Sequence, residues 1–238
     1  MKTLYGVLTV ALLAYAVALV LGGQHADYPT WLDWAVAAFE LLASVLVLAR
    51  GVLSARDRRY TLLLGAACCA WALGDFAMTA ETQGGATPAT ISLANYLWAG
   101  FFPLAYVGVM VLMQRDVKKL TAANYLDGVV ATLVTSAALV AFAFHAIAKA
   151  SGAGTEGAAV NLVYPVGDLL LFGLTVVGIV ILPPGRRARW YLIAAAGLVN
   201  VAGDTAALFN GLVATNVGWF LDAMAWPASL LLISCAVW

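Results

Sequence analysis

Charged residues are scarce in this sequence, where Asp, Glu, Lys and Arg make up 10% of 238 residues, against about 25% in a typical soluble domain. Cysteine occurs only three times, at Cys68, Cys69 and Cys235, and each lies in an apolar stretch. The sequence therefore indicates neither a disulfide framework nor the paired spacing of a zinc site. A glycine-rich phosphate loop, a GxSxG elbow and an HExxH motif are also missing, so the common signatures of soluble enzymes do not apply.

Apolar residues dominate instead, at 64% of the chain with a mean hydropathy of +0.95. A helix needs about 20 consecutive apolar residues to cross a bilayer. Windows of that length occur at 3–23, 31–50, 60–81, 92–114, 122–146, 160–182, 189–212 and 216–238. We therefore predict an all-α polytopic membrane protein of about eight transmembrane helices, with residues 1–238 forming a single transmembrane domain.

The basic residues alternate between the predicted loops. Lys149 is the one basic residue outside a set of alternate loops that starts at the N-terminus. That set consists of Lys2, Arg50, Arg56, Arg58, Arg59, Arg115, Lys118, Lys119, Arg186, Arg187 and Arg189. Loops rich in Lys and Arg stay in the cytoplasm. We therefore predict a multi-pass plasma-membrane protein with both termini in the cytoplasm.

The sequence also contains an apparent internal repeat. Windows 60–81 and 189–212 reach Gly74-Asp75 and Gly203-Asp204 at matching depth, and the following windows match as NYLWAGFFP and WFLDAMAWP. This predicts two halves, 1–119 and 120–238, of four helices each. An even number of helices makes the halves parallel, related by an axis along the membrane normal. Chance similarity between helices rich in small apolar residues is the alternative.

Acidic residues lie inside the predicted membrane segments, close to the ends that the charge pattern places outside. A carboxylate at the bilayer centre costs at least about 2.5–3.5 kcal/mol, and no intramembrane Lys or Arg is available to neutralise these groups. Glu40 lies deeper than the others and shares a helix face with Asp33, seven residues earlier. We therefore expect these acids to be protonated, hydrogen-bonded or bound to a cation.

Tryptophan, tyrosine and asparagine residues occur at about the same depth as the acids, and a polar floor with aromatic walls is typical of a small-molecule pocket. The candidate ligand-binding residues are Asp33, Glu40, Trp71, Asp75, Trp98, Tyr164, Asp168, Asn200, Asp204 and Asp222. His25 and His145 lie at a similar level, so a metal site stays open. Two alternatives remain, since acids also join helices by hydrogen bonds or relay protons.

Three stretches resemble a known family: ISLANYLWAGFFPLAYVGVMVLMQRD, YPVGDLLLFGL and VAGD, within residues 60–238. They are similar to the N-terminal membrane domain of actinobacterial cyclic-di-GMP signalling proteins, where the segments look like PSLAD, YPxxDLLLL and VADLLY. One departure is Asn95, which stands where the family has the Asp of PSLAD. Family members continue into GGDEF and often EAL domains. Because this chain stops at Trp238, we expect the membrane part of a longer protein or a stand-alone relative.

The resemblance implies a sensory or regulatory input domain, and enzymatic activity of the chain itself stays an open question. Its expected partners are the lipid bilayer, a cytoplasmic output domain in cis or in trans, and a small-molecule or cation ligand. A homodimer is an open alternative, and nucleic acid is not expected. Gly74-Asp75 and Asp204 are also similar to acidic residues in the third and seventh helices of lysoplasmalogenases. This second resemblance implies an intramembrane lipid hydrolase that uses one carboxyl group as acid and another as base. A small transporter using the repeat is the third hypothesis.

Overall fold

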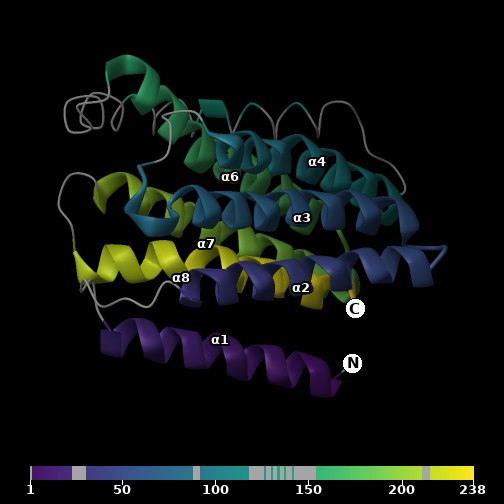
Figure 1. Ribbon diagram of the computed structural model, residues 1–238. Helices are drawn as coiled ribbons and strands as arrows, with labels where there is room; N and C mark the ends of the chain where they lie inside the picture. The colour runs from purple at the N-terminus through teal and green to yellow at the C-terminus, as the bar shows by residue number, and fades with distance from the viewer. Residues whose placement is uncertain are drawn as a thin grey trace.

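The computed structural model describes residues 2–22, 31–87, 92–117, 154–210 and 215–238, together with six isolated positions between 126 and 141. These ranges are helical throughout, apart from turns and loops (Figure 1). The long helices are α1 (Lys2–Gly22), α2 (Trp31–Leu53), α3 (Arg58–Glu81), α4 (Leu93–Asp116), α6 (Gly154–Ile181), α7 (Ala188–Asn210) and α8 (Asn216–Val237). Two 3-10 turns, η1 (Gln83–Gly85) and η2 (Pro184–Arg186), follow α3 and α6.

Seven of the described helices are long and apolar enough to cross a membrane. They confirm an all-helical polytopic chain and coincide with seven of the eight predicted windows. The remaining window, 122–146, lies almost entirely outside the described residues, as do His25, His145 and Lys149. Helix α6 begins at Gly154, ahead of the predicted 160, because a hydropathy window marks only the apolar part of a helix.

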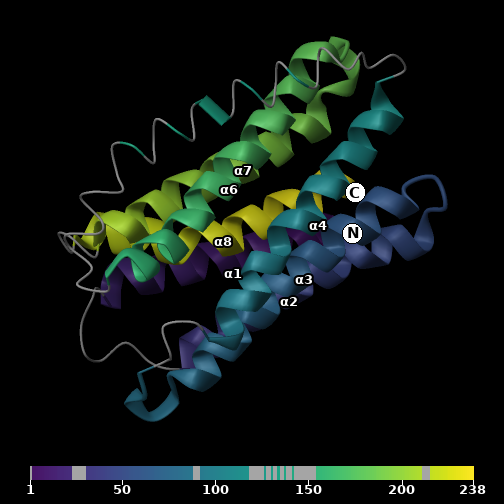
Figure 2. The same cartoon turned by 90° about the horizontal axis from the view of Figure 1, so that it is seen from above.

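Six of the seven helices form a closed ring. In order around the ring, the helices are α2, α3, α4, α6, α7 and α8, and α8 packs against α2 to close it. Figure 2 shows α2, α3 and α4 on one side, α6 and α7 on the other, and α8 between them. Helix α1 lies outside the ring and packs along α8. A cleft within this ring can therefore be lined by side chains from every helix of the ring.

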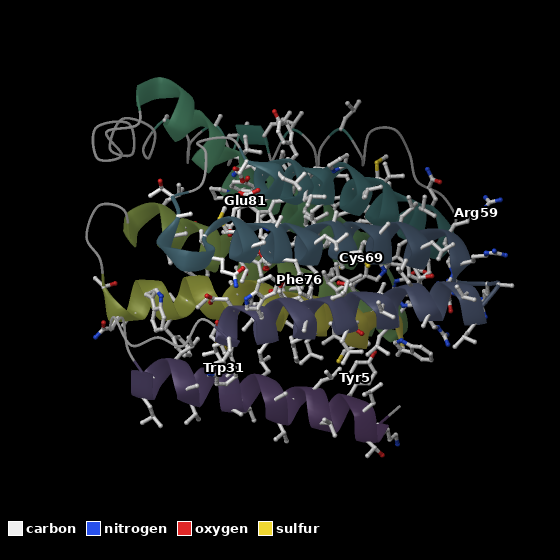
Figure 3. The ribbon with its side chains drawn as sticks, in the orientation of Figure 1. Tyr5, Trp31, Arg59, Cys69, Phe76 and Glu81 are labelled. Atoms are coloured by element: carbon white, nitrogen blue, oxygen red, sulfur yellow. The ribbon has the colours of Figure 1, made fainter. Side chains whose placement is uncertain are left out.

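The two ends of the helix bundle differ in charge. Both chain termini lie at the end that carries Arg59 (Figures 1 and 3), which we call the basic end. Trp31 and Glu81 lie toward the opposite end, which we call the acidic end (Figure 3). Asp33, Glu40, Asp75, Asp204 and Asp222 belong to the helix halves nearest the acidic end, and Asp168 lies at the middle of α6. The polarity inferred from the sequence is thus present in the fold.

Helix starts and helix packing have local causes in the sequence. The Ser92 backbone N–H donates to Oδ1 of Asn95 at 3.0 Å, which forms a capping box at the start of α4. The Thr215 hydroxyl accepts from the backbone N–H of Gly218 at 3.0 Å and caps α8. Such caps satisfy amides that have no partner within the helix.

An ion-pair cluster joins three helices at the basic end. Asp57, between α2 and α3, accepts from Arg50 of α2 at 2.8 Å and pairs with Arg115 of α4 at 2.7 Å. Burial disfavours the charged carboxylate, but the Ser54 hydroxyl and the two guanidinium groups outweigh it, so the pKa of Asp57 lies below its ordinary value. The cluster therefore requires an ionised Asp57.

Helix α7 joins the same region through Tyr60 of α3. Arg189 donates to the Tyr60 hydroxyl at 2.9 Å, and its guanidinium lies over the ring together with that of Arg115. The Trp190 indole N–H donates to Asp116, at the end of α4, at 3.0 Å. The basic end therefore links α2, α3, α4 and α7 by polar contacts.

Candidate functional site

A cleft of about 840 Å³ lies among the helices in the half of the bundle that contains the acids. All seven long helices contribute to its lining. The residues are Tyr15, Asp33, Val36, Glu40, Trp71, Asp75, Met78, Thr79, Thr82, Trp98, Tyr164, Asp204, Ala207, Trp219, Asp222, Ala223, Trp226 and Pro227. Five of them are acidic, and none is Lys or Arg.

The first group of contacts in the cleft centres on Asp75 of α3. The Trp98 indole N–H of α4 donates to Oδ1 of Asp75 at 2.8 Å. Gly74 allows this approach, because a Cβ at position 74 would overlap the Trp98 indole. Glu40 of α2, with 1% of its surface exposed, lies beside Asp75 within hydrogen-bonding reach. Asp75 thus joins α3 to both of its neighbours in the ring.

Glu40 lacks the donors that a buried carboxylate normally has. Among the described residues, no nitrogen or hydroxyl donor reaches either of its side-chain oxygens. Its polar neighbour is the Asp75 carboxyl group, and a hydrogen bond between two carboxyl groups requires a proton on one of them. The pair is therefore suited to hold a proton or to face a cation.

A second group of contacts has the same construction around Asp204 of α7. The Trp226 indole N–H of α8 donates to Oδ1 of Asp204 at 3.0 Å. Gly203 precedes it, and a Cβ at that position would overlap Ala225 of α8. Asp168 of α6 is fully buried and lies beside the Asp204 carboxyl group. Each group thus contains a Gly-Asp pair, an indole donor from the following helix and a second carboxyl group.

Aromatic rings form the wall between the two groups. Trp71 of α3 stacks on Trp226 of α8, with ring planes 13° apart. Tyr164 of α6 meets Trp71 and Trp98 edge to face. Its hydroxyl accepts from the Asn95 side-chain amide at 3.1 Å, so Asn95 positions a wall of the cleft.

The ten predicted site residues differ in how far they are buried. Asp33 and Asp222 are exposed and Asp75 is half-buried, whereas Glu40 and Asp204 are buried. Trp71, Trp98 and Tyr164 also line the cleft, which brings eight of the ten together. Asp168 and Asn200 are buried but do not line it. Whether any of the ten binds a ligand stays a prediction.

The main omission from the predicted site is Trp226. The sequence repeat aligns Trp98 with Asp222, whereas the indole that plays the part of Trp98 in the structure comes from Trp226. Helical spacing would have identified it, because Trp226 lies four residues after Asp222 and therefore shares its face of α8. Tyr15 was also missed, since its helix shows no polar stripe.

Within the described residues, no group of three or more His, Cys, Asp or Glu side chains is placed to hold a metal ion. We find no matching protein-family model, and no similar chain among curated proteins or solved structures. The site must therefore be interpreted from its own chemistry.

Proposed function

We propose that this chain is a membrane-embedded sensory domain whose acidic, aromatic-lined cleft binds a small cationic ligand. The observation that carries the proposal is the cleft lining, where the described residues include five carboxyl groups and several indoles but no basic side chain. Indole faces attract cations in addition to the carboxylates. Two buried lining residues, Glu40 and Asp204, have carboxyl oxygens without a hydrogen-bond partner among the described residues, and a cation would satisfy them.

Helix connectivity supports a route from the cleft to the basic end. The same helices that line the cleft, α2, α3, α4 and α7, are joined at the basic end by Asp57, Tyr60 and their arginine partners. A ligand shifts an equilibrium between two helix packings only if it binds them with different affinities. A ligand that changes the spacing of α3 and α8 at Trp71 and Trp226 would alter this junction.

We further propose eight spans, with the basic end in the cytoplasm. Helix α4 ends at the basic end, and α6 runs toward the same end (Figure 1). Arg186, which follows α6, donates there to the backbone carbonyl of Asp116. The chain between them, which contains the apolar window 122–146, would therefore cross the membrane once more. This arrangement leaves both termini in the cytoplasm and the cleft facing outward, in agreement with the positive-inside rule.

A parallel repeat of two four-helix halves, 1–119 and 120–238, accounts for the two similar carboxyl–indole groups. Asp75 would correspond to Asp204, and Glu40 would take the place of Asp168. Such duplication occurs in transporters, so ion or amine uptake into liposomes is the assay for the transporter hypothesis. The output partner proposed from the family resemblance is a cytoplasmic GGDEF-type domain, in cis or in trans.

The binding test is thermal unfolding of the purified protein with a panel of inorganic cations, amines and quaternary ammonium ions. A ligand is expected to raise the wild-type Tm, because binding to the folded state adds stability. Asp75→Asn and Asp204→Asn should abolish the shift. Asp116→Asn is the matched control, since Asp116 also accepts from an indole but lies at the basic end. A wild-type protein that responds to no member of the panel would contradict the proposal.

A second test separates a sensor from a passive binding site. Arg56, in the exposed α2–α3 loop, is replaced by Cys in a background with the three native cysteines changed to Ala. The rate of thiol labelling is then measured with and without the ligand found above. A sensor should show a changed rate at the basic end, whereas equal rates would indicate binding without transmission.

One observation also favours the lipid hydrolase. Asp75 and Asp204 line the same cleft from opposite sides of the ring, so one carboxyl group could protonate a vinyl ether while the other activates water. Turnover of lysoplasmalogen by the purified protein, abolished by Asp75→Asn and by Asp204→Asn, would replace the sensor by this enzyme. Among the described residues the lining holds no basic side chain, which disfavours a substrate that carries a phosphate.

A further inference from the structure

A second, apolar pocket adjoins the cleft. It has a volume of about 220 Å³ and lies between α1 and α2. Leu12 and Ala18 line it from α1, and Leu32, Ala35 and Phe39 line it from α2. We call this pocket the α1–α2 slot. Tyr15, Val36 and Pro227 line both the slot and the cleft, so the two spaces share a wall and adjoin one another.

The position of α1 places the slot away from the basic end. Tyr5 holds α1 to α8 near that end, with its hydroxyl 2.8 Å from Oγ of Ser234 (Figure 3). The slot residues lie further along α1 and face the first turns of α2, near Trp31. The apolar slot and the acidic cleft thus occur in the same half of the molecule.

Helix α8 adds a neutral acceptor where the two spaces meet. Pro227 has no amide hydrogen, so it cannot donate to the carbonyl of Ala223, four residues earlier. Ala223 lines the cleft, and Pro227 lines both spaces. A carbonyl without its helical donor, next to Asp222, favours a positively charged or hydrogen-donating group at this point.

We infer that the ligand is a single-chain ammonium amphiphile, with its cationic head in the cleft and its hydrocarbon tail in the α1–α2 slot. The inference rests on the proposed function and specifies the ligand of the same site. The acidic lining, which has no Lys or Arg among the residues that the structure describes, selects an ammonium head and rejects an adjoining phosphate. The adjoining apolar slot selects a tail.

The test uses alkyltrimethylammonium ions of increasing chain length, starting from tetramethylammonium, with protein held in amphipol. Affinity is measured for the wild type, for Ala35→Leu and Ala18→Leu, which fill the slot from its two walls, and for Ala38→Leu. Ala38 is an exposed α2 residue outside the slot and is the matched control. Partitioning of the tail into amphipol is common to all four proteins, so their ratios isolate the slot.

Tetramethylammonium should bind all four proteins equally. As the alkyl chain lengthens, the affinity of the wild type and of Ala38→Leu should rise relative to that of both slot variants. The expected rise is up to about fourfold per methylene, the equivalent of about 0.8 kcal/mol. For the decyl compound, the wild type is expected to bind at least about tenfold more tightly than either slot variant. A ratio that stays near one across the series would overturn the tail site, and a lipid chain already in the slot would give that result.

The head group is tested separately with a lysophosphocholine of the same chain length. It should bind at least about tenfold more weakly than the alkyltrimethylammonium ion, because its phosphate would lie among carboxylates. Equal or tighter binding would overturn the head-group assignment. If short ammonium ions bind but chain length has no slot-dependent effect, the tail inference fails and the proposed function stands. If no cation of any class binds, the proposed function itself fails.

Discussion

Trp71 of α3 lies face to face with Trp226 of α8, with the two ring planes 13° apart. Trp226 also donates to Asp204, and the Trp71 ring lies near that of Trp98, which donates to Asp75. The stack therefore connects the two carboxyl–indole groups across the cleft. The Trp71 ring thus lies between the indole donors of the two groups.

Replacing Trp226 by Phe keeps an aromatic ring and removes the indole donor. Asp204 is 8% exposed and its second oxygen already lacks a partner among the described residues, so the variant should lose about 1.5–3 kcal/mol of stability. Trp98→Phe should lose less, because Asp75 is half-buried. Reversible unfolding in mixed micelles measures both. Trp31→Phe, at a side chain that is 64% exposed, is the control, and a loss as large as that of Trp226→Phe would contradict the argument.

Gly74→Ala should displace the Trp98 indole, because the added Cβ would overlap the ring. We expect a stability loss of about 1–3 kcal/mol, as for other overpacked sites, and a weaker Tm response to ligands. Gly100→Ala in α4 is the control, since a Cβ at that position meets nothing within 4 Å. Its expected stability is unchanged or slightly higher, because Ala favours a helix over Gly. Equal effects of the two substitutions would argue against close packing at Gly74.

Acid should weaken the basic end through Asp57. Its pKa is lowered in the folded state, so its ionised form contributes stability above the unfolded-state pKa of about 3.9, and this contribution is lost as the pH falls through the folded-state pKa. The stability difference between the wild type and Asp57→Asn should be largest near neutral pH and shrink below about pH 4. Ser54→Ala removes one of the groups that lower the pKa and should show an intermediate difference. A difference independent of pH would contradict this assignment.

Single cysteines test the proposed orientation. Arg56→Cys at the basic end and Gln83→Cys at the acidic end are both exposed, and each is made in a background without native cysteines. In intact cells, an impermeant maleimide should label Cys at position 83 and leave position 56 unlabelled until the membrane is opened. The reverse pattern would place the cleft on the cytoplasmic side.

Hydropathy and charge predicted most of the fold, because lipid requires helices of a certain length and leaves basic loops on one side. The acid positions led to the predicted ligand site, and eight of its ten residues line the cleft, although ligand binding there stays a prediction. Which helices meet was not predictable. Asp168 and Asn200 share the depth of the lining residues but lie outside the lining, and Trp226 entered the site through packing of α8 against α7 and α3. Such contacts depend on helix rotation, which a small-residue apolar sequence specifies weakly.

The separation of acids and bases along the bundle gives a chain of zero formal net charge a large electric dipole. In the proposed orientation, which places the basic end in the cytoplasm, a membrane potential that is negative inside favours this arrangement of charges. A cation that moves from the acidic end to the depth of Glu40 crosses part of the membrane field, where a full crossing is worth about 2.3 kcal/mol per 100 mV. Occupancy of the cleft should therefore depend on the energised state of the cell as well as on ligand concentration.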